Sequence, residues 1–537
     1  MLSTSLLSKG HTAPQMSNAA LGVCVYDAKL SGRGQDCRPQ ESELGDDFKP
    51  MQRALEIILI LVIIGTTLTF GGVQPLTLSL MEVTLLLCLL ARLVQQARQG
   101  EVNLRLPIWP ALFLALVGLQ VVPLPSSLVG WLAAARVAGP DVAGLSQAHA
   151  NRMTISIYPH DTLVAFFKLL AYVCAFILAA DVFDSRKRRS LLVRTLIGLG
   201  LFEAAYGTVQ YLTGWQKIFA YTKVYYTEEA TGTYINHNHF AGFLELTTPF
   251  VLGFVFYAFQ NWTGARKDGA RPTPSRAPGA AGGQVLLYTF LMTLMVIAVI
   301  LSRSRAGIIV TIIAIVFVAL LAWLRLRRRA WMVGLLLFLV IAAGYGLWIG
   351  LGPILTRFEQ LGATHELAVE GRISFWKDSI PLIRDYPVAG VGLGNFGTAF
   401  RHYQTSMVTL YVDHAHNDYL EFASETGVLG TALLFLPILY LLGKMTLFVA
   451  KDPRRFRPTI VLGCVGSTLG IVLHSFIDFN LQVPANALTF AVILGIGYKA
   501  CCVEPLEETQ PAAPAQEARP IRRPNHRQPD VQRAHHP

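Results

Sequence analysis

The stretch GIIVTIIAIVFVALLAWL, residues 307–324, decides the fold class, because it is a continuous apolar run without a charged side chain. As an α-helix, a run of this length crosses the roughly 30 Å hydrocarbon core of a bilayer. Basic side chains flank it, with Arg303 and Arg305 before it and RLRRR at residues 325–329 after it. Similar runs recur from Ala54 to Cys502, so the sequence predicts an integral membrane protein.

Composition supports this class. Hydrophobic residues make up 53% of the 537-residue chain and charged residues only 15%, whereas about a quarter of a soluble domain is charged. We predict an all-α polytopic membrane protein with about twelve transmembrane helices and one large, mainly helical extracytoplasmic loop. The expected spans lie near residues 54–70, 76–94, 107–122, 162–183, 190–213, 239–259, 285–302, 307–324, 331–351, 428–449, 459–477 and 484–502.

The basic residues predict the orientation, since cytoplasmic loops retain Lys and Arg. The basic groups near residues 92–105, 186–189, 266–276, 325–329 and 451–457 all fall in loops on one side of the twelve-span topology. That side is therefore expected to be cytoplasmic, together with both termini. The net charge of +11 follows from this bias and from attraction to anionic lipid headgroups, and it requires no nucleic-acid partner.

The topology divides the chain into terminal segments, helices and a catalytic loop. The N-terminal segment lacks the apolar core of a cleavable signal peptide, and Met51 is a candidate for the true start. All seven cysteines lie in spans or cytoplasmic segments, so no disulfide framework is expected on the outer face. The expected parts are a disordered cytoplasmic segment (1–50), helices one to nine (51–351), a periplasmic loop (352–427), helices ten to twelve (428–502) and a disordered cytoplasmic tail (503–537).

The segment VDHAHNDYL, Val412–Leu420, is unusually polar for such a chain. It contains His414, His416, Asn417 and the flanking carboxylates Asp413 and Asp418. Imidazole titrates near working pH, so one histidine is a candidate general base, oriented by a carboxylate. A zinc or manganese site is the rival interpretation, and structural hydrogen bonding is a third. The pattern supplies no distant third ligand, and residues i and i+2 of a helix point to different faces.

Three arginines are candidates for binding a phosphate group. Arg303 and Arg305 lie at the outer end of a span, where basic residues are disfavoured, and Arg372 lies in the large loop within GRISFW. A guanidinium binds phosphate with two parallel hydrogen bonds. The alternatives are snorkelling of Arg303 and Arg305 to lipid headgroups, and a surface ion pair of Arg372 with Glu370 or Asp378.

Further polar side chains are predicted near the outer leaflet. His237 and His239 lie at the mouth of the sixth span, and Glu245 lies about two turns inside it. His474 and Asp478, at i, i+4 spacing, end the eleventh span. Polar groups at membrane depth face protein or water, so together they suggest a polar cavity open to the outside. Each one alone has a simpler structural interpretation.

The segment GLGNFG, with Gly392, Gly394 and Gly397, matches the GxGxxG pattern of dinucleotide-binding proteins. That pattern indicates a nucleotide only between a strand and a helix of a βαβ unit. Here it follows PVAGV in an extracytoplasmic loop. We therefore predict no nucleotide, and no nucleotide-sugar donor.

The segments SRSRAG, GRISFWKDSIPLIRDYPVAGVGLGNF and HAHNDYLEFASETGVLG, in this order, resemble the O-antigen ligase and O-antigen polymerase superfamily of bacterial envelopes. The resemblance covers roughly residues 285–450. It implies an inner-membrane, multi-pass, inverting glycosyltransferase without a metal or cofactor. The implied donor is a glycan on undecaprenyl diphosphate at the periplasmic face. The implied acceptor is a lipid A core sugar in ligases, another lipid-linked repeat in polymerases, or a protein hydroxyl in related enzymes.

The resemblance also implies roles for particular residues. The family's outer-end arginine corresponds to Arg303 or Arg305, its loop arginine to Arg372, and its histidine to His414 or His416. The arginines would stabilise the departing diphosphate, and the histidine would accept the proton of the acceptor hydroxyl. We expect ligase activity first and polymerase activity as the alternative.

Two other classes remain as rivals. A secondary transporter is also polytopic, but such proteins commonly contain inverted repeats, and the chain shows no convincing half-to-half repeat. A scaffold for other polysaccharide-assembly enzymes would not need the histidines and arginines.

Overall fold

A computed structural model describes residues 49–100, 107–133, 135–136, 151–265, 278–326, 367–405, 411–452 and 456–503. Contacts separate Met1–Lys49 from Pro50–Pro537, and the elements below belong to the second unit, apart from Lys49 at the start of the first helix. Three predicted segments lie outside the described residues: nearly all of 1–50, the span near 331–351 and the tail from residue 504.

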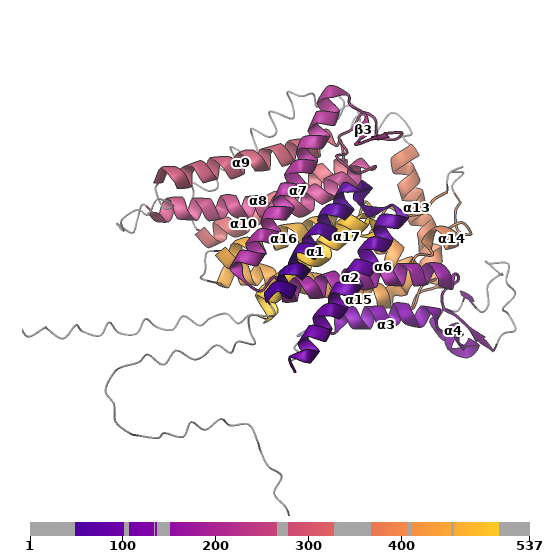
Figure 1. The fold of residues 1–537 in the computed structure, drawn as a ribbon. Helices are drawn as coiled ribbons and strands as arrows, with labels where there is room; N and C mark the ends of the chain where they lie inside the picture. Colours follow the sequence, from indigo (N-terminus) through magenta and orange to yellow (C-terminus); the bar gives the residue numbers. More distant parts are fainter. Residues whose placement is uncertain are drawn as a thin grey trace, which may run out of the picture. The chain divides into compact units, whose positions relative to one another are not determined.

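The described part of the chain is mainly helical (Figure 1). It contains nine helices that are long and apolar enough to cross a membrane, so the protein is a multi-pass membrane protein. They are α1 (Lys49–Leu68), α2 (Pro75–Arg98), α6 (Pro159–Val182), α7 (Arg186–Thr213), α8 (His237–Ala265), α9 (Pro278–Leu301), α10 (Arg305–Leu326), α15 (Asp418–Lys451) and α17 (Pro484–Tyr498), which continues into the π-helical turn η6 (Lys499–Val503).

Two predicted spans form shorter apolar helices, α3 (Trp109–Val121) and α16 (Phe456–His474). Proline explains the length of α3. Pro110 occupies its first turn, where no backbone donor is needed, and Pro123 lies two residues after the last residue, Val121. The described residues therefore support nine long spans and two short ones in place of the eleven predicted there.

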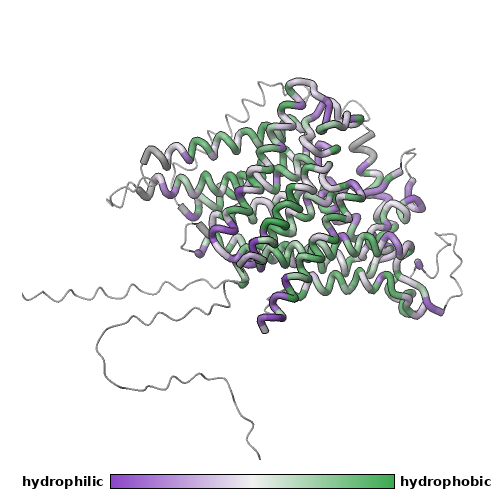
Figure 2. The backbone as a smooth tube through the Cα atoms, in the orientation of Figure 1, coloured by the Kyte–Doolittle hydropathy of each residue, from purple (hydrophilic) through white to green (hydrophobic). Residues whose placement is uncertain are grey.

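Helix α8 lies at the centre of the bundle, where it packs against α7, α9, α10 and α16. Close approach of α16 depends on two glycines. A Cβ on Gly463 would lie 2.2 Å from Phe250, and one on Gly466 would lie 2.5 Å from Pro249. Figure 2 shows apolar residues along the helices and polar residues near their ends.

Short elements connect and cover the helices. The described residues contain two antiparallel two-stranded sheets: β1 (Leu124–Pro125) pairs with β2 (Arg152–Met153), and β3 (Lys217–Ile218) pairs with β4 (Tyr221–Thr222). The 3-10 turns η2 (Phe70–Gly72) and η5 (Asn480–Gln482) precede α2 and α17. Elements α4 (Ser126–Leu132), α13 (Leu367–Asp385) and α14 (Phe396–Phe400) share a separate apolar cluster with the segment before α15. This cluster positions the polar segment described below.

The first two turns of α15 are separated from the rest of that helix by a kink at Gly427. Its φ of 66° and ψ of −177° are non-helical. A Cβ there would lie 2.1 Å from the carbonyl oxygen of Val388, because the chain after α13 packs directly on the kink. The kink thus divides a polar helix start from an apolar span.

Gly427→Ala is expected to lower the free energy of unfolding by about 2 kcal/mol, because it combines a positive φ with a backbone clash. Thermal unfolding of the detergent-solubilised protein measures the effect. Gly443→Ala is the matched control: Gly443 lies in the same helix with open space around it, so alanine should be neutral or stabilising there. Equal effects of the two substitutions would contradict this role of the kink.

Candidate functional site

The HAHN segment lies outside any helix or strand and leads directly into α15. Asn417 is the N-cap of that helix and accepts a hydrogen bond from the Leu420 amide at 3.1 Å. Its side-chain amide donates to Phe476 O at 2.9 Å, which fixes the segment against the loop after α16. Trp376 of GRISFW donates its indole N–H to Ala415 O at 3.1 Å. Two motifs that the sequence singled out are therefore in direct contact.

Because the segment is not helical, the argument from helix faces against a metal does not apply to His414 and His416. The structure shows instead that each histidine contacts a different carboxylate. Each imidazole uses Nδ1 for its own carboxylate, Glu421 for His414 and Asp478 for His416. Within the described ranges, no group of three or more His, Cys, Asp or Glu side chains could hold a metal ion.

His414 is bound tightly by Glu421. Its Nδ1 lies 2.7 Å from Glu421 Oε1, while Oε2 of the same carboxylate accepts the Ala415 amide at 2.9 Å. The imidazole also stacks on the Phe479 ring, with centroids 4.1 Å apart. Burial alone would lower the pKa of His414, but the charge and hydrogen bond of Glu421 outweigh it and raise the pKa to about 9. His414 is therefore mainly an imidazolium at neutral pH.

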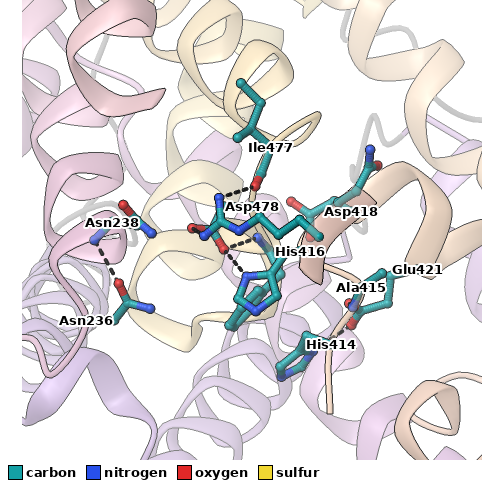
Figure 3. Close-up of polar contacts among 12 residues, drawn as sticks. Asn236, Asn238, His414, Ala415, His416, Asp418, Glu421, Ile477 and Asp478 are labelled. Atoms are coloured by element: carbon teal, nitrogen blue, oxygen red, sulfur yellow. Dashed lines mark hydrogen bonds and ion pairs between the residues drawn. The ribbon is translucent and has the colours of Figure 1, made fainter. Parts of the chain in front are cut away.

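His416 pairs with Asp478, with 3.2 Å between Nδ1 and Oδ1 (Figure 3). Its ring meets Phe479 edge-on at 4.9 Å, so the two histidines contact the same aromatic ring. The backbone of His416 has a φ of 50°. Non-glycine residues in the left-handed region are strained and often occur at functional sites.

Asp478 connects His416 to Arg372. Arg372 Nη2 lies 3.6 Å from Asp478 Oδ2, and its Nη1 donates to Ile477 O at 3.1 Å. Burial would raise the pKa of Asp478, but the hydrogen bond from His416 and the Arg372 guanidinium hold it well below its usual range. The carboxylate is thus an anion that positions both groups. The alternative partner Asp378 bonds Thr405 at 2.9 and 2.8 Å.

Arg303 lies between α9 and α10, with a left-handed backbone and two side-chain contacts. Its backbone has a φ of 55°, its guanidinium lies 5.6 Å above the Tyr211 ring, and its Nη1 contacts Glu228 Oε2 at 3.1 Å. Arg305 is the first residue of α10. The contact with Glu228 ties Arg303 to the loop before α8.

A chain of contacts links Arg303 to the histidine side of the site. His237 Nδ1 lies 2.6 Å from the carbonyl oxygen of Ser302, and its ring packs on Tyr226 at 4.6 Å. Tyr226 lies close enough to Arg372 and Asp478 for their charges to act on its phenol. Burial, followed by the charge of Asp478, raises the pKa of Tyr226. The arginine motifs thus border one polar region.

The remaining predicted residues have other partners. His239 is buried with its ring 4.8 Å from Phe479. His474 and Asp478 point to different groups, because His474 Nδ1 pairs with Glu245 at 2.9 and 3.0 Å. Asp418 accepts from Ser475 at 2.8 Å and from the Leu481 amide at 3.3 Å, and Asp413 is exposed.

The expected orienting role of Asp413 or Asp418 is therefore taken by other carboxylates. Glu421 orients His414 and Asp478 orients His416. Sequence reasoning missed Glu421 and Phe479 as site residues. The available signal for Glu421 was an acidic side chain in the first turn of a helix that begins next to the histidines.

The His414–Glu421 pair predicts a pH dependence of stability. The pKa of His414 is about 9 in the folded protein, whereas an ordinary histidine has a pKa of about 6.5. The pair therefore contributes its full stabilisation below about pH 6.5. We expect up to about 3 kcal/mol of this stabilisation to be lost as the pH rises from there through about 9. Thermal unfolding across this range should show the loss in wild type and a smaller one in Glu421→Gln. His402→Ala, at an exposed histidine, should behave like wild type; an undiminished loss in Glu421→Gln would refute the assignment.

A search of curated proteins found no matching sequence. Residues 290–435 match the family model described as O-antigen ligase, and the matched region includes Arg303, Arg372, His414 and His416. The match supports the resemblance of this region to the O-antigen ligase and polymerase superfamily that the sequence indicated.

Proposed function

We propose that the protein transfers a glycan from undecaprenyl diphosphate to an acceptor hydroxyl at the periplasmic face, with inversion at the anomeric carbon, as an O-antigen ligase does. The observation that carries this proposal is the buried carboxylate of Asp478. It pairs with a candidate base, His416, and with a candidate phosphate ligand, Arg372. A base beside an anion-binding group is the minimum that such a transfer needs.

The arginines act on the leaving group in this mechanism. Breaking the anomeric C–O bond leaves its electron pair on a diphosphate that is already negatively charged. Arg372 keeps guanidinium donors beyond those used by Ile477 and Asp478. Arg303 follows Ser302, whose carbonyl oxygen contacts His237. Cationic donors aimed at the growing charge lower the barrier.

We assign the general base to His416. A base must be neutral before it accepts a proton, and the raised pKa of His414, about 9, leaves little of that residue neutral at pH 7. His416 directs Nδ1 to Asp478, so Nε2 is available for the acceptor proton, and the carboxylate stabilises the resulting imidazolium. His414, fixed by Glu421, supplies a further positive charge beside the reacting groups.

Arg372→Lys is expected to reduce transfer about 100-fold, because an ammonium cannot reproduce the planar, two-pronged contact of a guanidinium. The rate of glycan transfer to acceptor in membranes of a complemented deletion strain measures this. Arg384→Lys is the matched control, since Arg384 is exposed on the same helix. Full activity of Arg372→Lys would count against a phosphate-binding role.

The glycan profile of the deletion strain tests the function itself. Loss of long glycan from its acceptor, with full-length polymer retained on undecaprenyl diphosphate, is the result expected of a ligase. Accumulated single repeats would instead identify a polymerase of the same superfamily. Normal profiles after complementation with His416→Ala and Arg372→Ala would overturn the catalytic assignment and favour a transporter or scaffold.

A further inference from the structure

One of the arginines that we assign to binding the donor's diphosphate, Arg303, already forms an ion pair with a carboxylate of the protein. Glu228, in the loop between β4 and α8, lies 3.1 Å from Arg303 Nη1. The Arg303 side chain is 14% exposed, whereas that of Glu228 is 77% exposed. One partner of this ion pair is therefore enclosed, and the other is almost fully solvated.

The backbone on both sides of the pair is held in place. Lys223 donates to Glu229 O at 2.9 Å, and the Ala230 amide donates to Leu301 O at 3.1 Å, which anchors the loop to the end of α9. Next to Arg303, the Ser304 amide donates to Ser302 Oγ at 3.2 Å. Glu228 can consequently leave the guanidinium by a side-chain rotation alone, while the backbone keeps it close by.

We propose that Glu228 competes with the diphosphate for Arg303 and so promotes release of the diphosphate product. The inference rests on the proposed function, because it takes Arg303 as a ligand of the donor's diphosphate. It adds a residue that governs how long this anion stays bound, rather than one that acts on the reacting bond.

The charge balance of the reaction explains why such a competitor is useful. The acceptor oxygen bonds to the anomeric carbon, its proton goes to His416, and the C–O bond to the diphosphate breaks. The electron pair stays on the diphosphate, which therefore gains a negative charge. Arginines that bind the donor thus bind the product more strongly. A tethered carboxylate has a high effective concentration at Arg303 and opposes this retention.

The experiment measures binding of inorganic pyrophosphate to the full-length protein in detergent by titration calorimetry. Glu228→Gln should bind pyrophosphate roughly two- to fivefold more tightly than wild type, as expected for loss of one exposed ion pair. Arg303→Gln should bind it more weakly. Asp161→Asn, which removes an equally negative side chain at a half-exposed position beside His160, should leave the affinity unchanged.

The double variant Glu228→Gln with Arg303→Gln separates competition from a general charge effect. Under competition, Glu228→Gln has no further effect once Arg303 is absent, because the contested group is gone. The same tightening in both backgrounds would reduce the role of Glu228 to long-range repulsion and overturn the proposal.

The remaining outcomes show whether the competition by Glu228 fails or the role of Arg303 itself fails. Weaker binding by Arg303→Gln with no change in Glu228→Gln would refute the competition and leave the proposed function intact. Unchanged binding by Arg303→Gln would refute the role of Arg303 itself. In turnover, Glu228→Gln should lower KM for the donor and strengthen inhibition by pyrophosphate, with a lower kcat where release limits the rate; unaltered inhibition would contradict the proposal.

Discussion

His416→Ala is expected to reduce glycan transfer by roughly 10²- to 10⁴-fold, the range associated with loss of a general base. The loss should appear mainly in kcat, because Arg372 and Arg303, which bind the diphosphate in our proposal, remain present. Transfer to an acceptor in membranes, measured over a range of donor concentrations, separates the two parameters. Pyrophosphate affinity provides an independent check and should change little.

His414→Ala should have a different signature. His414 is predominantly cationic and fixed by Glu421, so its loss removes a positive charge rather than the base. We expect a smaller decrease in activity that His414→Arg partly restores. His402→Ala, at an exposed position earlier in the chain, serves as the control. A larger loss in His414→Ala than in His416→Ala would reverse the assignment of base and cation.

The sequence was sufficient to predict the membrane class, because each span is a local property of consecutive apolar residues. The predicted span at residues 307–324 lies within α10 (Arg305–Leu326), for example. Arg372 was singled out because an arginine in GRISFW stands out in an apolar chain, and its phosphate-binding role stays a prediction. The kink at Gly427 was not, because it depends on the backbone near Val388 packing against α15.

The pairing of the site residues could not be predicted for a related reason. His416 and Asp478 are 62 positions apart, and Arg372 and Ile477 are 105 apart. Such contacts arise from the packing of α13 and the α16–α17 connection around the HAHN segment. Phe479, which contacts three histidine rings, looks like one more apolar residue in the sequence. Its role depends on its neighbours in space.

A second large effect is expected at the buried pair of Glu245 and His474. Both side chains are 0% exposed, and His474 Nδ1 lies 2.9 Å from Glu245 Oε1 between α8 and α16. Removal of one partner leaves the other polar group buried without compensation. Glu245→Ala should therefore lower the free energy of unfolding by about 3–5 kcal/mol, measured by denaturation in mixed detergent micelles.

The double variant Glu245→Met with His474→Leu tests whether this cost is electrostatic. Apolar side chains of similar volume avoid the burial of charge, so stability should return to within about 1 kcal/mol of wild type. His474 also begins the turn that carries Asp478, because its carbonyl oxygen accepts the Asp478 amide at 3.0 Å. That backbone bond survives both substitutions, so transfer activity should recover together with stability. Recovered stability without activity would mean that the ionisable pair also affects the charge or position of Asp478 and His416, in addition to holding α8 and α16 together.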